Sequence, residues 1–173
     1  MQPGERRSAI LNILRQSDAP VSAAALAKRF AVSRQIIVGD VALLRASQHD
    51  IAATPRGYVL QKPFGAGFLR TIACCHTGKD ALRAELYAAV DNGCAVLDVT
   101  VDHPVYGELR GALHIFSRRD VDAFVEKLSS LRASPLSSLT GGVHLHTLHC
   151  PDEDAFLRVC QALKTLHILQ EEA

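Results

Sequence analysis

Apolar positions in the first sixty residues follow helical spacing and then change to strand spacing. Between Arg6 and Arg15, a stripe of isoleucine and leucine recurs at the interval expected for one face of a helix. Two further helical segments lie between Val21 and Arg45. The segment 51–60 contains two short apolar runs joined by a Pro-Arg-Gly turn. This order predicts a core of three helices followed by a β-hairpin.

The second and third helical segments are separated by only two residues. Ser22 and Ser33 each precede an apolar run and can accept a hydrogen bond as helix N-caps. Between them, residues 31–32 leave room for nothing longer than a tight turn. The face that joins the first of these helices to the core is formed by Ala25, Leu26 and Phe30. This spacing is typical of a helix-turn-helix.

A helix-turn-helix inserts the N-terminal end of its second helix into the major groove of DNA. The predicted groove-facing residues at the start of that helix are Ser33, Arg34, Gln35 and Val38. Glutamine can read adenine, and arginine can read guanine or hold a phosphate. Arg56, at the hairpin tip, is placed to meet a phosphate. Helical hairpins also form cores and protein-contact modules, but a hairpin in this position matches a wing and favours sequence-specific DNA binding.

From Phe68 onward, strand and helix patterns alternate. The predicted strands are 68–75, 95–102, 108–116 and 142–150, and the helices are 79–91, one with an apolar stripe over 121–131, and 152–169. The order β-α-β-β-α-β-α predicts an α+β fold: an antiparallel, ferredoxin-like sheet with helices on one face and the first strand inside. We expect a DNA-binding domain over 1–62 and a regulatory domain over 66–173, with Gln61–Gly65 as linker.

Charge supports this division of the chain. Up to Lys62 there are nine basic and four acidic residues, whereas the remainder has ten basic and fourteen acidic residues. The net charge of +1 therefore conceals a basic module and an acidic one. Phosphate neutralisation requires locally concentrated positive charge, so only the first module is suited to DNA. A bias of this size also occurs by ordinary scatter.

The hydropathy of the chain and its cysteine count indicate the cellular compartment of the protein. No stretch reaches the length of a membrane span, and the N-terminus lacks the apolar run of a signal peptide. We therefore expect a cytoplasmic protein without membrane contact. All five cysteines lie in the second module without CxxC spacing, and an odd number in a cytosolic chain predicts free thiols.

Seven of the eight histidines fall in the second module. His144 and His146 are two residues apart on a predicted strand, so their side chains share one face. His76 ends the first strand of this module, and Glu85 projects from the helix that follows. Three imidazoles and a carboxylate suit zinc, nickel, iron or cobalt better than magnesium. A His-x-His strand is, however, more often a solvent-facing or hydrogen-bonded pair than a metal site.

Four segments together resemble one family. SRQIIVGDVALLR, ATPRGYVL, VDHPVYGELRG and GGVHLHTL are similar to segments of niacin-responsive transcriptional repressors, which join a winged helix-turn-helix to a 3H domain. The resemblance covers roughly residues 5–172, and its last two segments are the specific ones. It implies a divalent metal site, with nickel or zinc the best candidates. On this chain the site falls on His76, Glu85, His144 and His146.

The resemblance also implies partners. Family members bind nicotinic acid as a corepressor, act as homodimers on a partly palindromic operator in double-stranded DNA, and repress genes for NAD synthesis or niacin uptake. A dimer agrees with physical expectation, because one recognition helix reads few base pairs. For the carboxylate-bearing effector we consider His103, Tyr106 and Arg110, although Tyr106 and Arg110 are equally suited to packing and to solvation.

Two features depart from the family pattern, and two other functions compete with that of a repressor. The helix from Lys79 begins one residue later, relative to His76, than we expect for the family, which bears on the reach of Glu85. Gly39 lies within the recognition helix, where glycine costs about 1 kcal/mol against alanine. The alternatives to a ligand-gated repressor are a metal-dependent enzyme with an accessory winged helix, and a metal sensor without an organic ligand. No catalytic motif in the sequence supports the enzyme.

Overall fold

The computed structural model of the chain describes residues 1–17, 19–60 and 66–170. The chain forms two compact units, Met1–Pro63 and Phe64–Ala173. Each unit has its own cluster of buried apolar side chains. The predicted linker Gln61–Gly65 lies outside the described residues. No helix in the described part of the chain is long and apolar enough to cross a bilayer.

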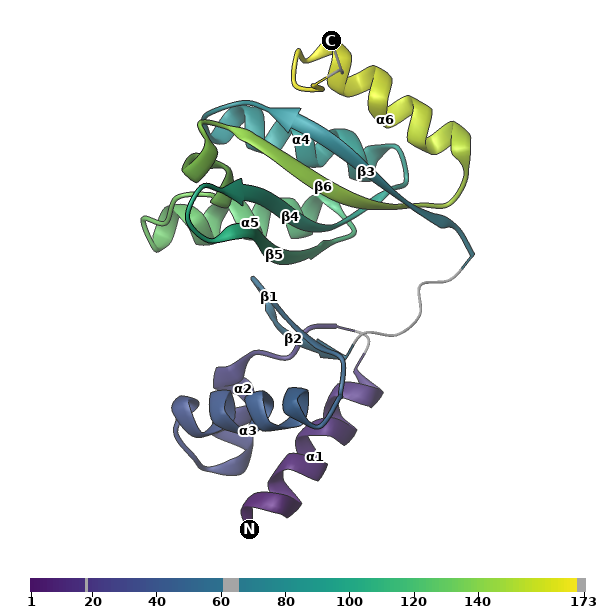
Figure 1. Cartoon of the computed structure of the whole chain (residues 1–173). Coiled ribbons are helices and arrows are strands. Elements are labelled where there is room, and N and C mark those ends of the chain that lie inside the picture. The colour runs from purple at the N-terminus through teal and green to yellow at the C-terminus, as the bar shows by residue number, and fades with distance from the viewer. Residues whose placement is uncertain (18, 61–65, 171–173) are drawn as a thin grey trace. The chain divides into compact units, whose positions relative to one another are not determined.

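The first unit contains three helices and a two-stranded hairpin (Figure 1). The helices are α1 (Pro3–Gln16), α2 (Ala23–Phe30) and α3 (Arg34–Ala46), and the strands are β1 (Ile51–Thr54) and β2 (Gly57–Leu60). Ser22 caps α2 by accepting a hydrogen bond from the Ala25 amide, and Ser33 caps α3 by accepting one from Ile36. The antiparallel hairpin and both caps agree with the sequence prediction. Val21 adds an antiparallel bridge to β2.

One buried ion pair ties α1 to α3. The Arg6 Nε atom lies 2.6 Å from an Asp40 carboxylate oxygen, and Arg7 approaches the other oxygen at 3.6 Å. The Asp40 side chain is 5% exposed. Because the Asp40 carboxylate is buried, the two arginines compensate the cost of removing its charge from water.

The second unit is a four-stranded antiparallel sheet with helices packed on it. The strands are β3 (Phe68–Cys75), β4 (Ala95–His103), β5 (Gly107–Ile115) and β6 (Val143–Cys150), in the order β3-β6-β4-β5. The α+β prediction is confirmed. The expectation that the first strand lies inside the sheet is wrong, because β6 occupies the inner position and β3 lies at the edge.

Helices α4 (Lys79–Asp91), α5 (Arg118–Ser130) and α6 (Glu153–Thr165) contribute to a single core with the sheet. Figure 1 shows α4 and α5 behind the sheet. A short 3₁₀ helix, η1 (Leu136–Thr140), precedes β6. The predicted apolar stripe over 121–131 ends at Leu131, but this residue is 66% exposed and follows the last residue of α5, Ser130. Leu166, within the predicted last helix, is 44% exposed and follows the last residue of α6, Thr165.

The predicted continuation of the last helix to Leu169 is wrong. His167 adopts a left-handed conformation, and the chain then runs beside the free edge of β3. There the Cys75 amide donates to the Ile168 carbonyl, and the Gln170 amide donates to the Ala73 carbonyl. The unpaired backbone groups of an edge strand are satisfied in this way.

Candidate metal centre and nucleic-acid interface

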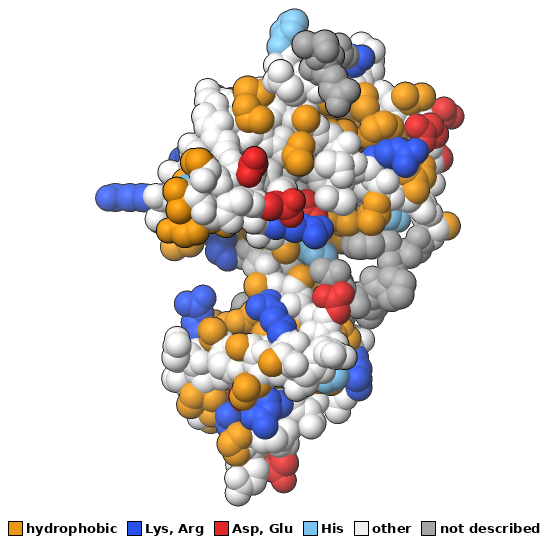
Figure 2. Space-filling model, viewed as in Figure 1, with side chains coloured by type: hydrophobic (Ala, Val, Ile, Leu, Met, Phe, Trp, Pro, Cys, Tyr) orange, Lys and Arg blue, Asp and Glu red, His pale blue; other side chains and the backbone are white. Residues whose placement is uncertain are grey.

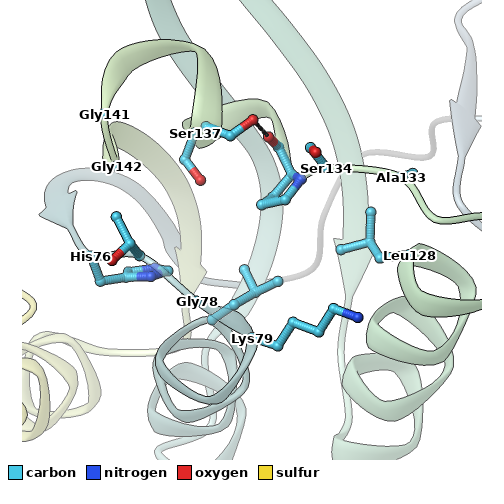
Figure 3. Close-up of a pocket in the computed structure, with 13 residues that line it drawn as sticks. His76, Gly78, Lys79, Leu128, Ala133, Ser134, Ser137, Gly141 and Gly142 are labelled. Atoms are coloured by element: carbon cyan, nitrogen blue, oxygen red, sulfur yellow. Dashed lines mark hydrogen bonds between the residues drawn. The ribbon is translucent and has the colours of Figure 1, made fainter.

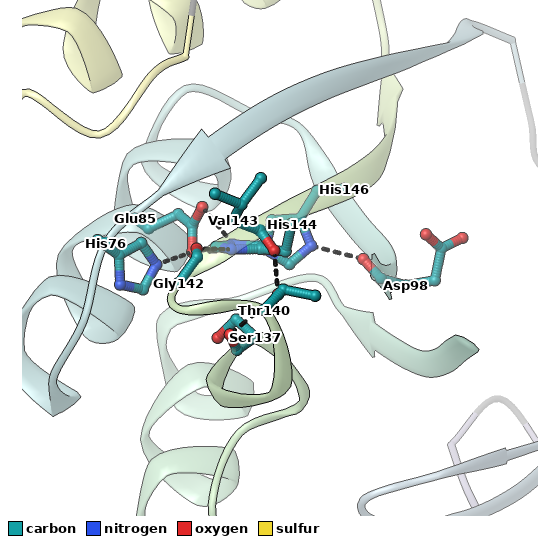
Figure 4. Close-up of polar contacts among 9 residues, drawn as sticks. All are labelled: His76, Glu85, Asp98, Ser137, Thr140, Gly142, Val143, His144 and His146. Atoms are coloured by element: carbon teal, nitrogen blue, oxygen red, sulfur yellow. Dashed lines mark hydrogen bonds and ion pairs between the residues drawn. The ribbon is translucent and has the colours of Figure 1, made fainter. Parts of the chain in front are cut away.

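Three elements bring one carboxylate and three imidazoles together. His144 and His146 alternate along β6 with the exposed Val143 and Leu145, so both imidazoles face the helices. His76 follows β3 directly. Glu85 lies in the apolar stripe of α4, three residues after Leu82, and is therefore turned toward the same side of the sheet. Figure 4 shows the four side chains pointing toward one another.

The Glu85 carboxylate is the centre of this cluster. One of its oxygens lies 2.7 Å from Nε2 of His76, and the other lies 3.1 Å from Nε2 of His144. Nε2 of His146 approaches at 3.4 Å. The side chains of Glu85, His144 and His146 are each at most 2% exposed. The later start of α4 relative to His76 therefore does not keep Glu85 from the histidines.

Backbone carbonyls orient two of the imidazoles. Nδ1 of His144 lies 2.8 Å from the Gly142 carbonyl, and Nδ1 of His146 lies 2.6 Å from the Asp98 carbonyl. A carbonyl only accepts, so each Nδ1 carries the proton and donates it. In the neutral rings, Nε2 then presents a lone pair to the carboxylate. Lone pairs facing a buried anion require protons or a cation between them, and Nε2 of His146 lies 3.4 Å from the carboxylate, the longest of the three separations.

This donor set fits a divalent transition metal. Nitrogen and carboxylate ligands are usual in such centres, and so are the backbone carbonyls that here orient the His144 and His146 imidazoles. His76, Glu85, His144 and His146 can supply four ligand atoms. The structure thus brings together all four residues that the sequence nominated.

Proton binding in this cluster is strongly coupled. Burial raises the pKa of Glu85, but the charge on His146 and hydrogen bonds from three histidines outweigh burial and hold this pKa well below 4.5. Burial lowers the pKa of His146, but the charge of Glu85 and its hydrogen bond raise this pKa above 6.5. Without a metal, a protonated His146 therefore neutralises the buried carboxylate at pH values below the raised pKa of this imidazole.

Sequence reasoning missed one neighbour of the cluster. Cys74 pairs with His144 across β3 and β6, and its sulfur lies within 4.8 Å of ligand atoms of His144 and Glu85. Burial, followed by the charge of Glu85, raises the pKa of Cys74 well above its ordinary value. Because the thiolate is the form that ligates metals, this thiol is a weaker candidate than the imidazoles. Only the strand pairing reveals its position.

The three effector candidates lie on the β4–β5 hairpin. Arg110 forms an ion pair with the buried carboxylate of Asp98, the residue whose carbonyl accepts from His146. His103 accepts hydrogen bonds from the Val105 and Tyr106 amides through Nδ1. Tyr106 is 74% exposed beside it. Arg110 thus supports a residue that positions His146, while His103 orders the hairpin turn.

The predicted DNA-facing residues are exposed on α3. Ser33, Arg34, Gln35 and Val38 point away from the core, whereas Ile37 and Val41 are buried. Arg56 lies at the β1–β2 turn, which a hydrogen bond from its amide to the Thr54 hydroxyl tightens. Figure 2 shows Lys and Arg side chains at several places on the first unit. The N-terminal end of α3 and the hairpin are available to a nucleic acid.

Comparison with known proteins agrees with this architecture. Residues 69–172 match the family described as the 3H domain, and residues 6–59 match one described as an HTH domain. The chain is 44% identical over 168 residues to the "Probable transcription repressor NiaR" of Thermotoga maritima, covering 97% of this chain and 95% of the relative. It is 43% identical over 167 residues to the "Transcription repressor NadR" of Bacillus subtilis, covering 95% and 92%.

Both relatives are named as transcription repressors, and the matches extend over both units of the chain. The enzyme interpretation is thereby set aside, and the chain is a transcription repressor that uses an HTH domain to bind DNA. It belongs to the family of repressors in which an N-terminal HTH domain is joined to a C-terminal 3H domain.

Proposed function

We propose that this repressor silences genes of NAD biosynthesis or niacin uptake, as an operator-bound homodimer with nicotinic acid as corepressor and a divalent metal ion in the 3H domain. The observation that carries this proposal is the convergence of three imidazoles on a buried carboxylate, in a chain whose other unit is a DNA-binding domain. The names of the two relatives support the repressor role, and the segments that resemble niacin-responsive repressors support nicotinic acid as the corepressor.

The proposed metal ligands are His76, Glu85, His144 and His146, with nickel or zinc as the ion. When bound, the ion would supply positive charge and an open coordination position suited to a pyridine nitrogen or a carboxylate. The chain's own contribution is orientation: the Gly142 and Asp98 carbonyls hold the two imidazoles of β6 with their lone pairs toward the centre.

The proposed DNA contacts divide into two kinds. Gln35 and Val38, with Arg34 beside them, reach base edges from the start of α3, and Val38 is 37% exposed and suited to a thymine methyl group. Arg56 and the Ser33 region contact phosphates. A homodimer doubles this contact set, and a partly palindromic operator would mirror its two-fold symmetry.

A promoter mobility-shift experiment tests the proposal. Purified protein is titrated into labelled promoter DNA with nickel or zinc, with and without nicotinic acid. We expect the shift to require nicotinic acid at low protein concentration. A shift that responds to metal alone would support the metal-sensor alternative and contradict the corepressor.

Strand β6 provides a matched pair of variants for the metal site. His144→Ala and His146→Ala should each lower bound metal and the nicotinic acid response together. His149→Ala serves as the control, because His149 lies opposite Leu69 on the other face of the sheet. Bound metal is measured by elemental analysis. Full metal content in both cluster variants would contradict the site.

A further inference from the structure

Two cysteines contact each other in the core of the second unit. The Sγ atom of Cys94 lies 3.1 Å from that of Cys150, and the two residues are 2% and 0% exposed. The remaining cysteines are arranged differently. Cys74 and Cys75 follow one another on β3, so their side chains lie on opposite faces of the sheet, and Cys160 is half-buried on α6. Within the described part of the chain, no other two cysteines have a hydrogen bond between their sulfur atoms.

The backbone places Cys94 and Cys150 opposite each other. Strands β4 and β6 are antiparallel, with Ala95 opposite His149. One step further along the same register brings Cys94 opposite Cys150, in agreement with the contact between their sulfur atoms. Directly opposite residues of antiparallel strands have Cα atoms about 4.5 or 5.5 Å apart, and disulfides join Cα atoms about 4.4–6.8 Å apart. The two cysteines therefore occupy backbone positions that a disulfide bond can join.

Both backbone positions are fixed by further hydrogen-bonded neighbours. The Cys94 amide donates to the Ala89 carbonyl at the end of α4, and Cys150 is also paired with Phe68 of β3. A disulfide S–S bond is about 2.05 Å long, so the two sulfur atoms need to approach by about 1 Å. Rotation about the two Cα–Cβ bonds can supply a movement of this size. Bond formation is therefore compatible with the existing strand pairing.

The two thiols lie away from the metal cluster. They are next to the C-terminal ends of α4 and β6. His76 lines a cavity of about 260 Å³ at the opposite end of both elements, where Lys79 begins α4 and Gly142 precedes β6 (Figure 3). A bond between the two thiols therefore leaves the metal ligands in place.

Burial keeps both cysteines in the thiol form. It raises the pKa of Cys150 to about 12. Burial also raises the pKa of Cys94, although the hydrogen bond with Cys150 and the charge of Arg158 oppose this rise. The thiolate is the nucleophile in thiol oxidation, so Cys94 is the residue that reacts first. Because little thiolate is present at neutral pH, we expect oxidation to be slow there and faster as pH rises.

From this geometry we infer that Cys94 and Cys150 are a redox-sensitive pair, at which a peroxide closes a disulfide bond that joins β4 to β6. The Cys94 thiolate attacks one peroxide oxygen, the O–O bond breaks, and the products are a sulfenic acid and a hydroxide that takes up the proton released by Cys94. The Cys150 sulfur then attacks the Cys94 sulfur, the S–O bond breaks, and water leaves with the Cys150 proton. The two thiols lose two electrons, and the peroxide is reduced to two water molecules.

The disulfide would close a long segment of the regulatory domain. Residues 94–150 include β4, β5, α5 and β6. A cross-link restricts the unfolded chain, and the restriction increases with the length of the closed segment. Oxidation therefore stabilises the 3H domain without involving its metal ligands, and thiol reductants reverse it by exchange. This stabilisation is independent of the proposed metal and corepressor.

Peroxide treatment of the full-length protein tests the inference. Zinc is present throughout, because it has no redox chemistry of its own. Remaining thiols are alkylated in denaturant, and mass spectrometry of unreduced peptides identifies each disulfide. A parallel sample is refolded from denaturant with oxidised and reduced glutathione, so that burial does not limit access to the thiols. Cys94→Ala removes one partner, and Cys160→Ala is the matched control, because Cys160 packs against the same core outside the pair.

We expect a peptide in which Cys94 is joined to Cys150 after either treatment, in the wild-type protein and in Cys160→Ala but not in Cys94→Ala. Oxidation should raise the melting temperature of the wild-type protein by roughly 5–15 °C, and dithiothreitol should reverse the rise. The bound zinc should be unchanged. Because the oxidised and reduced wild-type protein have one sequence, this comparison does not depend on the folding of a variant.

Three results would contradict parts of the inference. If Cys94 and Cys150 remain thiols after both treatments, or pair instead with Cys75 or Cys160, the assigned pair is wrong. If the bond forms on refolding but never with peroxide, the assigned oxidant is wrong. If the bond forms and lowers the melting temperature, its closure strains the sheet and the stabilising role is wrong.

Discussion

Glu85 is the residue on which the regulatory domain's electrostatics depend. A buried carboxylate is tolerated only with compensating positive charge, and the three surrounding imidazoles supply it in one of two ways. They can be protonated, or they can be neutral and share a metal ion with the carboxylate. The two states differ in protons bound, so metal binding and pH are linked.

This linkage predicts a pH-dependent stabilisation by metal. Because the pKa of Glu85 is lowered in the folded state, its carboxylate stabilises the fold above pH 4.5, and this stability is lost on acidification. Because the pKa of His146 is raised, its imidazolium stabilises the fold below pH 6.5, and this stability is lost as pH rises through the raised pKa. The metal-free protein should therefore weaken on the alkaline side. Added nickel should raise the melting temperature increasingly between about pH 6 and pH 8, and hardly at about pH 5. Differential scanning fluorimetry with and without nickel measures this, and a pH-independent shift would contradict it.

Gly39 in α3 offers a second prediction for a single residue. A Cβ built at this position meets nothing within 4 Å, so no contact within the chain requires glycine. Gly39→Ala should stabilise the N-terminal unit by about 1 kcal/mol, because alanine restricts the unfolded chain and favours the helix. Chemical denaturation measures the change. If the operator backbone approaches this face closely, the same variant will bind operator more weakly despite its greater stability.

Among the elements, α1 and α3 are linked by the ion pair of Arg6 and Asp40. Asp40→Asn leaves Arg6, which is 12% exposed, beside a neutral amide, and should lower the free energy of unfolding of the N-terminal unit by about 1–3 kcal/mol. The exposed Asp50→Asn is the control, expected within about 0.5 kcal/mol of wild type. Metal binding by the second unit should be unchanged in both. Equal stability of the two variants in denaturant titrations would show that the pair contributes little.

The elements themselves were largely predictable from local patterns. Ser22 and Ser33 were identified as caps because capping depends on neighbouring residues only. The strand Phe68–Cys75 and the helix Lys79–Asp91 have the predicted limits. The end of the last helix was not predictable, because the residues after Thr165 pair with β3, which is distant in sequence.

For the whole molecule, the proposed function requires coupling between an effector site in one unit and DNA binding by the other. Thermodynamic linkage makes such coupling reciprocal, so operator DNA should raise nicotinic acid affinity by the same factor by which nicotinic acid raises operator affinity. Titrations of nicotinic acid in the presence and absence of saturating operator give one factor, and mobility shifts give the other. Unequal factors at matched metal and salt would show that the two ligands are not linked through one equilibrium.

Local sequence was sufficient to define the helix-turn-helix, its wing, and the side of β6 on which His144 and His146 lie, because helical period, strand alternation and caps depend on residues close together in the chain. Tertiary structure alone decided that β6 lies inside the sheet with β3 at its edge, that Cys74 lies opposite His144, and that a cavity opens beside His76. These features depend on which distant backbone segments exchange hydrogen bonds, and strand patterns of similar strength are compatible with several pairings.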